Sequence, residues 1–123
     1  MVRKKILLVD DSETSLLMSR MILSKANYDI LVAKDGADGL ERAVAERPDL
    51  VLLDVVMPKM NGFEACTAMR ARRETETIPI IMVTTRGEGT SVETGFKAGA
   101  TDYITKPVNG LELLTKVRNI LGD

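Results

Sequence analysis

Short, strongly apolar runs alternate with longer stretches of mixed polarity about five times along the chain. Runs without any polar residue, such as Ile6–Val9 and Leu50–Leu53, are typical of strands buried on both faces of a parallel sheet. Between these runs, apolar residues recur every three or four positions, which indicates helices. The pattern therefore predicts strands and helices in alternation.

Five strands and five helices are expected. The predicted strands, of which the second is the least apolar and is expected at a sheet edge, are about Lys5–Val9, Asp29–Ala33, Asp49–Asp54, Ile78–Val83 and Asp102–Thr105. The predicted helices are about Glu13–Lys25, Gly36–Arg47, Gly62–Arg72, Ser91–Ala98 and Asn109–Leu121. Such alternation implies right-handed βαβ crossovers and a doubly wound (βα)5 fold of the α/β class, with helices on both faces of a parallel sheet.

Helical spacing also indicates which side chains face the core. In the first helix the apolar residues at this spacing are Leu16, Leu17, Met21 and Ile22. In the second helix the residues expected to face inward are Ala37, Leu40, Ala43 and Val44.

Length and charge limit the classes of function. A chain of 123 residues suits one domain over residues 1–123, and a net charge of −1 gives no indication of direct nucleic acid binding. The apolar runs are too short to cross a membrane, and the N-terminal residues lack the apolar region and cleavage site of a signal peptide. A cytoplasmic protein without membrane insertion is expected.

Cysteine and histidine usage narrows the chemistry further. Cys66 is the single cysteine, so an internal disulfide is excluded, and its apolar surroundings predict a buried side chain rather than a reactive thiol. The absence of histidine excludes Ser-His-Asp and Cys-His catalysis and histidine-bound zinc. A bound metal would need oxygen ligands, which favours Mg²⁺, Mn²⁺ or Ca²⁺.

Three aspartates end the two most apolar strands. Asp10 and Asp11 follow the first strand, and Asp54 ends the third. Open α/β sheets bind ligands at the carboxyl ends of their strands. If the two strands are neighbours, three carboxylates converge, and their mutual repulsion requires a cation. The aspartates therefore predict a metal or phosphoryl-transfer site.

Two further strands end in side chains that complement these carboxylates. Thr84 follows the fourth strand, and Lys106 precedes Pro107 at the end of the fifth. A hydroxyl donor and an ammonium beside three carboxylates suit phosphoryl transfer, in which catalysis consists mainly of positioning and charge neutralisation.

These motifs together resemble the response regulator receiver domains of two-component signalling, a chemotaxis-regulator-like family. The resemblance covers about Lys5–Leu121 and is carried, in order, by Leu8-Val9-Asp10-Asp11-Ser12, Leu52-Leu53-Asp54-Val55-Val56-Met57-Pro58 with Asn61-Gly62, Val83-Thr84, Ala98-Gly99-Ala100-Thr101-Asp102-Tyr103 and Thr105-Lys106-Pro107. It implies a flavodoxin-like three-layer sandwich whose five parallel strands lie in the order 2-1-3-4-5.

The resemblance also implies roles for the acidic residues. Asp54 would be the phosphoacceptor, taking a phosphoryl group from the phosphohistidine of a histidine kinase or histidine phosphotransfer protein, or from a small acyl phosphate. Asp10, Asp11, Asp54 and the backbone carbonyl of Val56 would hold Mg²⁺ (or Mn²⁺). The domain would be a phosphorylatable signalling domain rather than an enzyme acting on other substrates.

The remaining roles concern switching. Lys106 would pair with Asp54 at rest and with the phosphoryl group afterwards, and Thr84 would bind another phosphoryl oxygen. Tyr103 would move with Thr84, and Pro107 would follow a cis peptide bond. A downstream effector would bind the face between the fourth and fifth helices, and a phosphatase could act on the product.

Two positions near the site are expected to tune its kinetics, Val56 and Arg86. The Val56 side chain cannot hydrogen-bond an attacking water, so slow self-dephosphorylation is expected. Two alternatives stay open: a small Mg²⁺-dependent aspartyl phosphohydrolase, which needs a second acid at the position of Val56, and a degenerate receiver that signals without phosphorylation. The sequence leaves the cognate kinase, the output pathway and the oligomeric state open.

Overall fold

The computed structural model describes residues 3–85 and 89–123 and confirms the alternation of strands and helices. The strands are β1 (Lys5–Val9), β2 (Asp29–Ala33), β3 (Leu50–Asp54), β4 (Ile80–Thr85) and β5 (Asp102–Lys106). The helices are α1 (Glu13–Lys25), α2 (Gly36–Glu46), α3 (Gly62–Arg70), α4 (Gly89–Ala98) and α5 (Gly110–Leu121).

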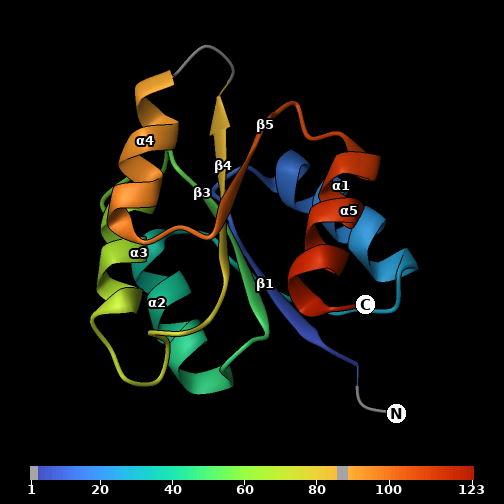
Figure 1. Ribbon diagram of the computed structural model, residues 1–123, viewed down its shortest axis with the longest axis horizontal. Helices are drawn as coiled ribbons and strands as arrows, with labels where there is room; N and C mark the ends of the chain where they lie inside the picture. Colours follow the sequence, from blue (N-terminus) through green and yellow to red (C-terminus); the bar gives the residue numbers. More distant parts are fainter. Residues whose placement is uncertain (1–2, 86–88) are drawn as a thin grey trace.

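The strands form one parallel sheet in the order β2-β1-β3-β4-β5. Helices α2, α3 and α4 cover one face of this sheet, and α1 and α5 cover the other (Figure 1). The three-layer fold and the strand order are as expected, with β2 at an edge. The chain order reverses between β1 and β3, and such a switch point is where open α/β sheets bind ligands.

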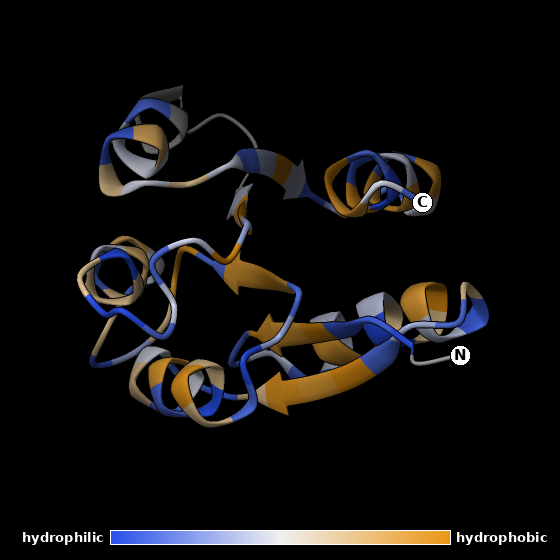
Figure 2. Cartoon of the chain, turned by 60° about the horizontal axis from the view of Figure 1, so that its bottom comes forward, coloured by the Kyte–Doolittle hydropathy of each residue, from blue (hydrophilic) through white to orange (hydrophobic). Residues whose placement is uncertain are grey.

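The apolar runs of the central strands supply both faces of the core. Alternate residues of a strand point to opposite faces, so Ile6 and Leu8 pack against α1 and α5, while Leu7 and Val9 pack against the other helices. The central strands are therefore apolar along most of their length, whereas the helices mix hydrophobic and hydrophilic residues (Figure 2). This two-sided burial explains the unbroken apolar runs.

Strand β4 begins at Ile80, later than the predicted Ile78. Pro79 lies between these residues and has no N–H to donate to a neighbouring strand. Its carbonyl oxygen accepts a hydrogen bond from the N–H of Val51 at 2.9 Å. The helix bounds also differ slightly: α2 ends at Glu46, α3 at Arg70, and α4 begins at Gly89.

The expected inward face of α2 was partly wrong. Ala43 is buried, but Ala37 is exposed; Gly39 lies against Val9 of the sheet, and Gly36 lies against Met60 in the loop after β3. A Cβ atom at Gly39 would lie 2.8 Å from a methyl carbon of Val9, so this helix packs closer to the sheet than a larger side chain permits. Hydropathy alone does not reveal a face built from glycine.

Helix α1 keeps part of its apolar surface in solvent. Leu16 is buried and Ile22 is half-buried, whereas Leu17 is 58% exposed and Met21 is 53% exposed. The buried stripe follows Leu16, Ser19 and Leu23, and the exposed pair lies beside that stripe.

Candidate functional site

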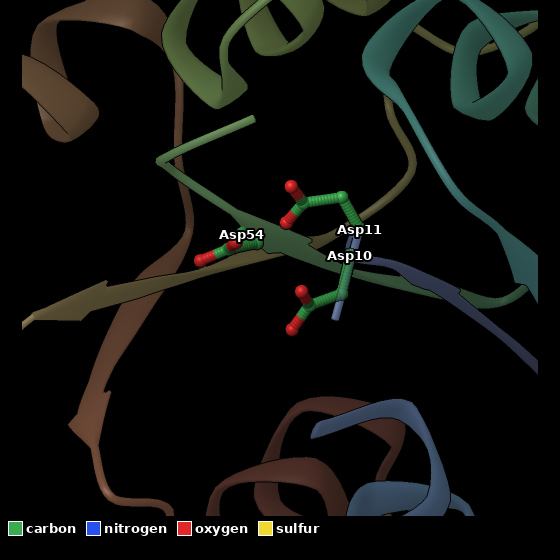
Figure 3. Close-up of side chains that lie close together, drawn as sticks. All are labelled: Asp10, Asp11 and Asp54. Carbon is green, nitrogen blue, oxygen red and sulfur yellow. The ribbon is translucent and has the colours of Figure 1, made fainter. Parts of the chain in front are cut away.

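Strand pairing brings the three aspartates together. In the β1–β3 register Val9 lies opposite Leu53, so Asp10 and Asp54, the next residue of each chain segment, are side by side. The side chains of Asp10, Asp11 and Asp54 project from the ends of these two strands (Figure 3). One carboxylate oxygen from each lies within 4.8 Å of the others.

Asp10 is held by the start of helix α1. Its Oδ1 accepts a hydrogen bond from the N–H of Ser12 at 2.9 Å, and the side chain is almost fully buried. The Ser12 hydroxyl in turn accepts from the N–H of Ser15 at 3.3 Å and caps the helix. The turn at Ser12 therefore both holds the Asp10 carboxylate in place and caps helix α1.

Lys106 joins the site from β5. Its Nζ lies 3.3 Å from Oδ2 of Asp10 and 3.3 Å from Oδ1 of Asp54, and it bridges the two buried carboxylates. Burial lowers the pKa of this amine, but Asp54 and Asp10 raise it more, so the net shift is upward and the ammonium form is retained. The Lys106–Pro107 peptide bond is cis. Asp10, Asp11, Asp54 and Lys106 are called the carboxylate site below.

Negative charge exceeds positive charge at this site. Burial raises the pKa of Asp54 to about 6, and the nearby charge of Asp10 adds to this, while Lys106 acts in the opposite direction. A single ammonium does not neutralise three carboxylates. Clustered carboxylate oxygens are the ligands that Mg²⁺ and Mn²⁺ prefer, so this donor set fits a divalent cation.

The loop after β3 packs closely against the backbone of Asp54 and Val55. Asn61 caps α3 in a reciprocal arrangement with Glu64, and the N–H of Gly62 donates to the carbonyl oxygen of Val55 at 2.9 Å. A Cβ atom at Gly62 would lie 2.3 Å from the carbonyl oxygen of Asp54. Gly62 therefore permits this close approach, and the Asn61-Gly62 pair is the signal for it in the sequence.

The other predicted site residues are more dispersed. Thr84 is buried near the end of β4, paired in register with Thr105, the residue before Lys106. Val56 lies just beyond Asp54 with its side chain 61% exposed. Arg86 lies outside the described residues.

Tyr103 lies on the edge strand β5, separate from the aspartates, and packs against the core that α2, α3 and α4 cover. Lys116, on α5, contacts it. The sequence reasoning missed Lys116, because nothing in the sequence distinguishes it from an ordinary lysine on a helix surface.

Cys66 is fully buried, as predicted, and burial raises the pKa of its thiol. This shift disfavours the thiolate and supports a packing role over a reactive one.

The family model for the response regulator receiver domain matches residues 6–118. The chain belongs to this family. Protein PilH of Pseudomonas aeruginosa is 42% identical over 118 residues, a match that spans 96% of this chain and 98% of PilH. The alkaline phosphatase synthesis transcriptional regulatory protein PhoP of Bacillus subtilis is 38% identical, but the match spans 98% of this chain and only 49% of PhoP.

Solved structures of receiver proteins have the same fold. The chemotaxis protein CheY4 of Vibrio cholerae superimposes with a TM-score of 0.91 at 35% identity, over 98% of this chain and all of that chain. The receiver domain of sensor histidine kinase PA1611 from Pseudomonas aeruginosa gives a TM-score of 0.92 at 27% identity, over 99% of this chain and all of that chain. That structure has a magnesium ion coordinated in its active site cleft.

Membership of the receiver domain family indicates the general function of this chain. Receiver domains are signalling domains of response regulators, they generally bind Mg²⁺ at an acidic site, and they act with histidine kinases and effectors. Within the described part of the chain, helices are too short or too polar to cross a membrane.

Proposed function

We propose that residues 1–123 form one phosphoacceptor domain of a two-component phosphorelay, and that Asp54 accepts the phosphoryl group. The observation that carries this proposal is the carboxylate site, in which a buried Asp54 is bridged to Lys106 beside two further carboxylates. The donor would be the phosphohistidine of a histidine kinase or phosphotransfer protein, or a small acyl phosphate. These 123 residues contain no histidine, so the donor phosphohistidine lies outside them.

The proposed reaction is a displacement at phosphorus. An oxygen of Asp54 forms the new P–O bond while the P–N bond to the donor imidazole breaks, and the imidazole nitrogen takes up a proton as it leaves. Lys106 exchanges its contact with Asp54 for a phosphoryl oxygen and so keeps its charge paired. Asp10, Asp11, Asp54 and the carbonyl of Val56 would hold Mg²⁺ or Mn²⁺, which neutralises charge on the phosphoryl oxygens.

Lys106 borders a hollow between α1 and the segment that follows β5. The hollow has a volume of about 370 Å³ and is lined by Ser15, Met18, Ser19, Lys106, Pro107 and Val108. The exposed apolar side chains of Leu17, Met18 and Met21 lie on the same helix. A protein donor that covers this part of α1 would exclude water from the reacting groups, which supports approach from this side.

Output would follow from movement at β4 and β5. Thr84 would bind a second phosphoryl oxygen, and Tyr103 would move with it, which would change the surface of α4, β5 and α5 for a downstream effector. A phosphatase could reverse the state. Activity on other substrates is not favoured, because a phosphohydrolase needs a second acid where this chain has the apolar, exposed Val56.

Intact mass spectrometry after incubation with acetyl phosphate and Mg²⁺ tests the proposal. The wild-type protein should gain one phosphoryl group, and Asp54→Asn should gain none. Asp11→Asn and chelation of the metal should both slow the gain strongly. Absence of an adduct with acetyl phosphate and with a phosphorylated histidine protein would favour the degenerate receiver, and repeated turnover of a phosphate ester would favour the hydrolase.

A further inference from the structure

A second group of polar and aromatic contacts surrounds Tyr103 at the far edge of the sheet. The ring of Phe96, on α4, meets the Tyr103 ring edge-on, with centroids 6.0 Å apart and planes at 89°. The Nζ atom of Lys116, on α5, lies over the same ring, 4.9 Å from its centroid. The Tyr103 ring is therefore contacted by side chains from both helices that flank β5. Phe96, Asp102, Tyr103 and Lys116 are called the edge cluster below.

The backbone of Tyr103 is bonded by the same cluster. Its N–H donates to Oδ1 of Asp102 at 2.8 Å, and its carbonyl oxygen accepts from Nζ of Lys116 at 2.6 Å. Lys116 also lies 3.3 Å from Oδ1 of Asp102. An edge strand leaves outward backbone groups without a neighbouring strand, and here the two side chains take the place of that strand at Tyr103.

Lys116 thus contacts Tyr103 at two points, the face of the ring and the backbone carbonyl. The carbonyl contact fixes the ammonium to the strand, and the cation in turn attracts the electron-rich face of the ring. A rotation of the ring about its side-chain bonds would leave the carbonyl contact intact but would give up the contact with the cation. The ring orientation seen here is therefore the one that Lys116 stabilises.

We propose that Lys116 is a positioning residue that holds Tyr103 in its unphosphorylated orientation and sets the balance between its two orientations. This inference rests on the proposed function, in which Tyr103 moves on phosphorylation of Asp54. A residue that stabilises one state of a two-state element shifts the populations by its difference in contact energy. Loss of the cation should therefore raise the population of the moved ring without any phosphoryl group.

Fluorine NMR of protein labelled with 3-fluorotyrosine tests this role, because the chain has only two tyrosines. Tyr28→Phe assigns the two signals, and Tyr28 then serves as an internal reference. Relaxation caused by a neutral gadolinium chelate in the solvent reports how exposed each ring is, and it does not depend on a nearby positive charge. The measured quantity is the ratio of this relaxation at Tyr103 to that at Tyr28.

The variants are Lys116→Met, which keeps an apolar stem without the charge, and Lys116→Arg, which keeps the charge. Before phosphorylation, Lys116→Met should shift the Tyr103 ratio measurably in the direction of the change that phosphorylation causes in the wild type. Lys116→Arg should stay near the wild-type value. Lys97→Met is the matched control, since Lys97 pairs with Glu93 on exposed α4 at 3.3 Å, and it should leave the ratio unchanged.

Intact masses of the same samples separate the two proposals. If wild-type protein forms no adduct, the proposed function fails. If the adduct forms and shifts the wild-type ratio, but Lys116→Met keeps the wild-type ratio before phosphorylation, the role of Lys116 is overturned. A change of equal size in Lys97→Met would overturn it as well.

Discussion

The carboxylate site and the edge cluster differ in their balance of negative and positive charge. At the carboxylate site three carboxylates meet one ammonium, and two of the carboxylates are buried. In the edge cluster one carboxylate meets one ammonium, and the remaining groups are rings and backbone atoms. The first region is therefore under electrostatic stress until a cation or phosphoryl group arrives, while the second is balanced as it stands.

The difference follows from position in the sheet. The carboxylates end the central strands, where backbone pairing on both sides fixes them and leaves them little freedom to separate. The edge cluster belongs to an edge strand and the two helices beside it, and side chains rather than a neighbouring strand bond the outward backbone there. A strained site at the centre of the sheet and a balanced cluster at its edge suit the proposed function, in which a chemical event at one changes the surface at the other.

The largest expected effect concerns the charge of Asp54. Its pKa of about 6 lies above the ordinary value of 3.8, so the folded state binds its proton more tightly than the unfolded chain does. Folding stability should therefore fall as pH rises from about 4 to about 6, and the full penalty, roughly 2–3 kcal/mol, should remain at pH 7. At pH 7 in the presence of a metal chelator, Asp54→Asn should raise the free energy of unfolding by roughly 2–3 kcal/mol.

Urea unfolding across this pH range checks the prediction. The difference between wild type and Asp54→Asn should vanish near pH 3.5, where both side chains are neutral, and Mg²⁺ should stabilise wild type more than the variant. Equal stability of the two proteins at pH 7 in chelator would show that the site is not under electrostatic stress.

The backbone of the site can be disturbed without changing a charge. In Gly62→Ala the new Cβ would meet the backbone at Asp54 and Val55, at 2.3 Å and 2.9 Å, and neither atom belongs to a flexible side chain. We expect a loss of about 2 kcal/mol and slower phosphorylation, measured by urea unfolding and intact mass.

Gly110→Ala is the control for Gly62→Ala. Its Cβ would lie 3.5 Å from the end of the Ile22 side chain, an ordinary contact, at the first residue of α5. Stability should be unchanged or slightly higher. A similar loss in both variants would mean that the close packing at Asp54 has no special role.

The rim of the carboxylate site should control how long the phosphorylated state persists. Val56 is exposed beside Asp54, so Asn at this position can orient a water molecule at little cost to folding. One added hydrogen bond, about 1 kcal/mol, corresponds to roughly fivefold faster loss of the acyl phosphate. The decay is followed by intact mass after removal of the donor, with Val56→Ala as control; an unchanged or slower rate in Val56→Asn would refute the expectation.

The smallest expected effect has the opposite sign to the first. Removing the charge of Lys116 should lower the free energy of unfolding by about 1 kcal/mol, since Lys116→Met loses a hydrogen bond to a carbonyl and a contact with a ring. Urea unfolding at pH 7 measures the change. An increase in stability would show that the edge cluster is under electrostatic stress, as the carboxylate site is. The two regions would then not differ in charge balance.

Much of this arrangement could be read from the chain. The unbroken apolar runs predicted a parallel sheet buried on both faces, and the position of Asp10, Asp11 and Asp54 after two of these runs predicted that they would meet. The expectation failed where hydropathy gives no signal. On α2, Gly39 lies against the sheet and Gly36 against the loop at Met60 while Ala37 is exposed, and part of the apolar surface of α1 stays exposed.

The order of elements, the parallel sheet and the residue types at its carboxyl edge could be predicted from the chain, because they follow from local periodicity and from the direction of the strands. The convergence of the aspartates and the pairing of Lys106 with Asp54 were expected. The contact of Lys106 with Asp10 and the bond of Lys116 to the backbone of Tyr103 emerge only in the packed structure. Electrostatic energy depends on distances of a few ångströms, and these distances arise only when the elements pack.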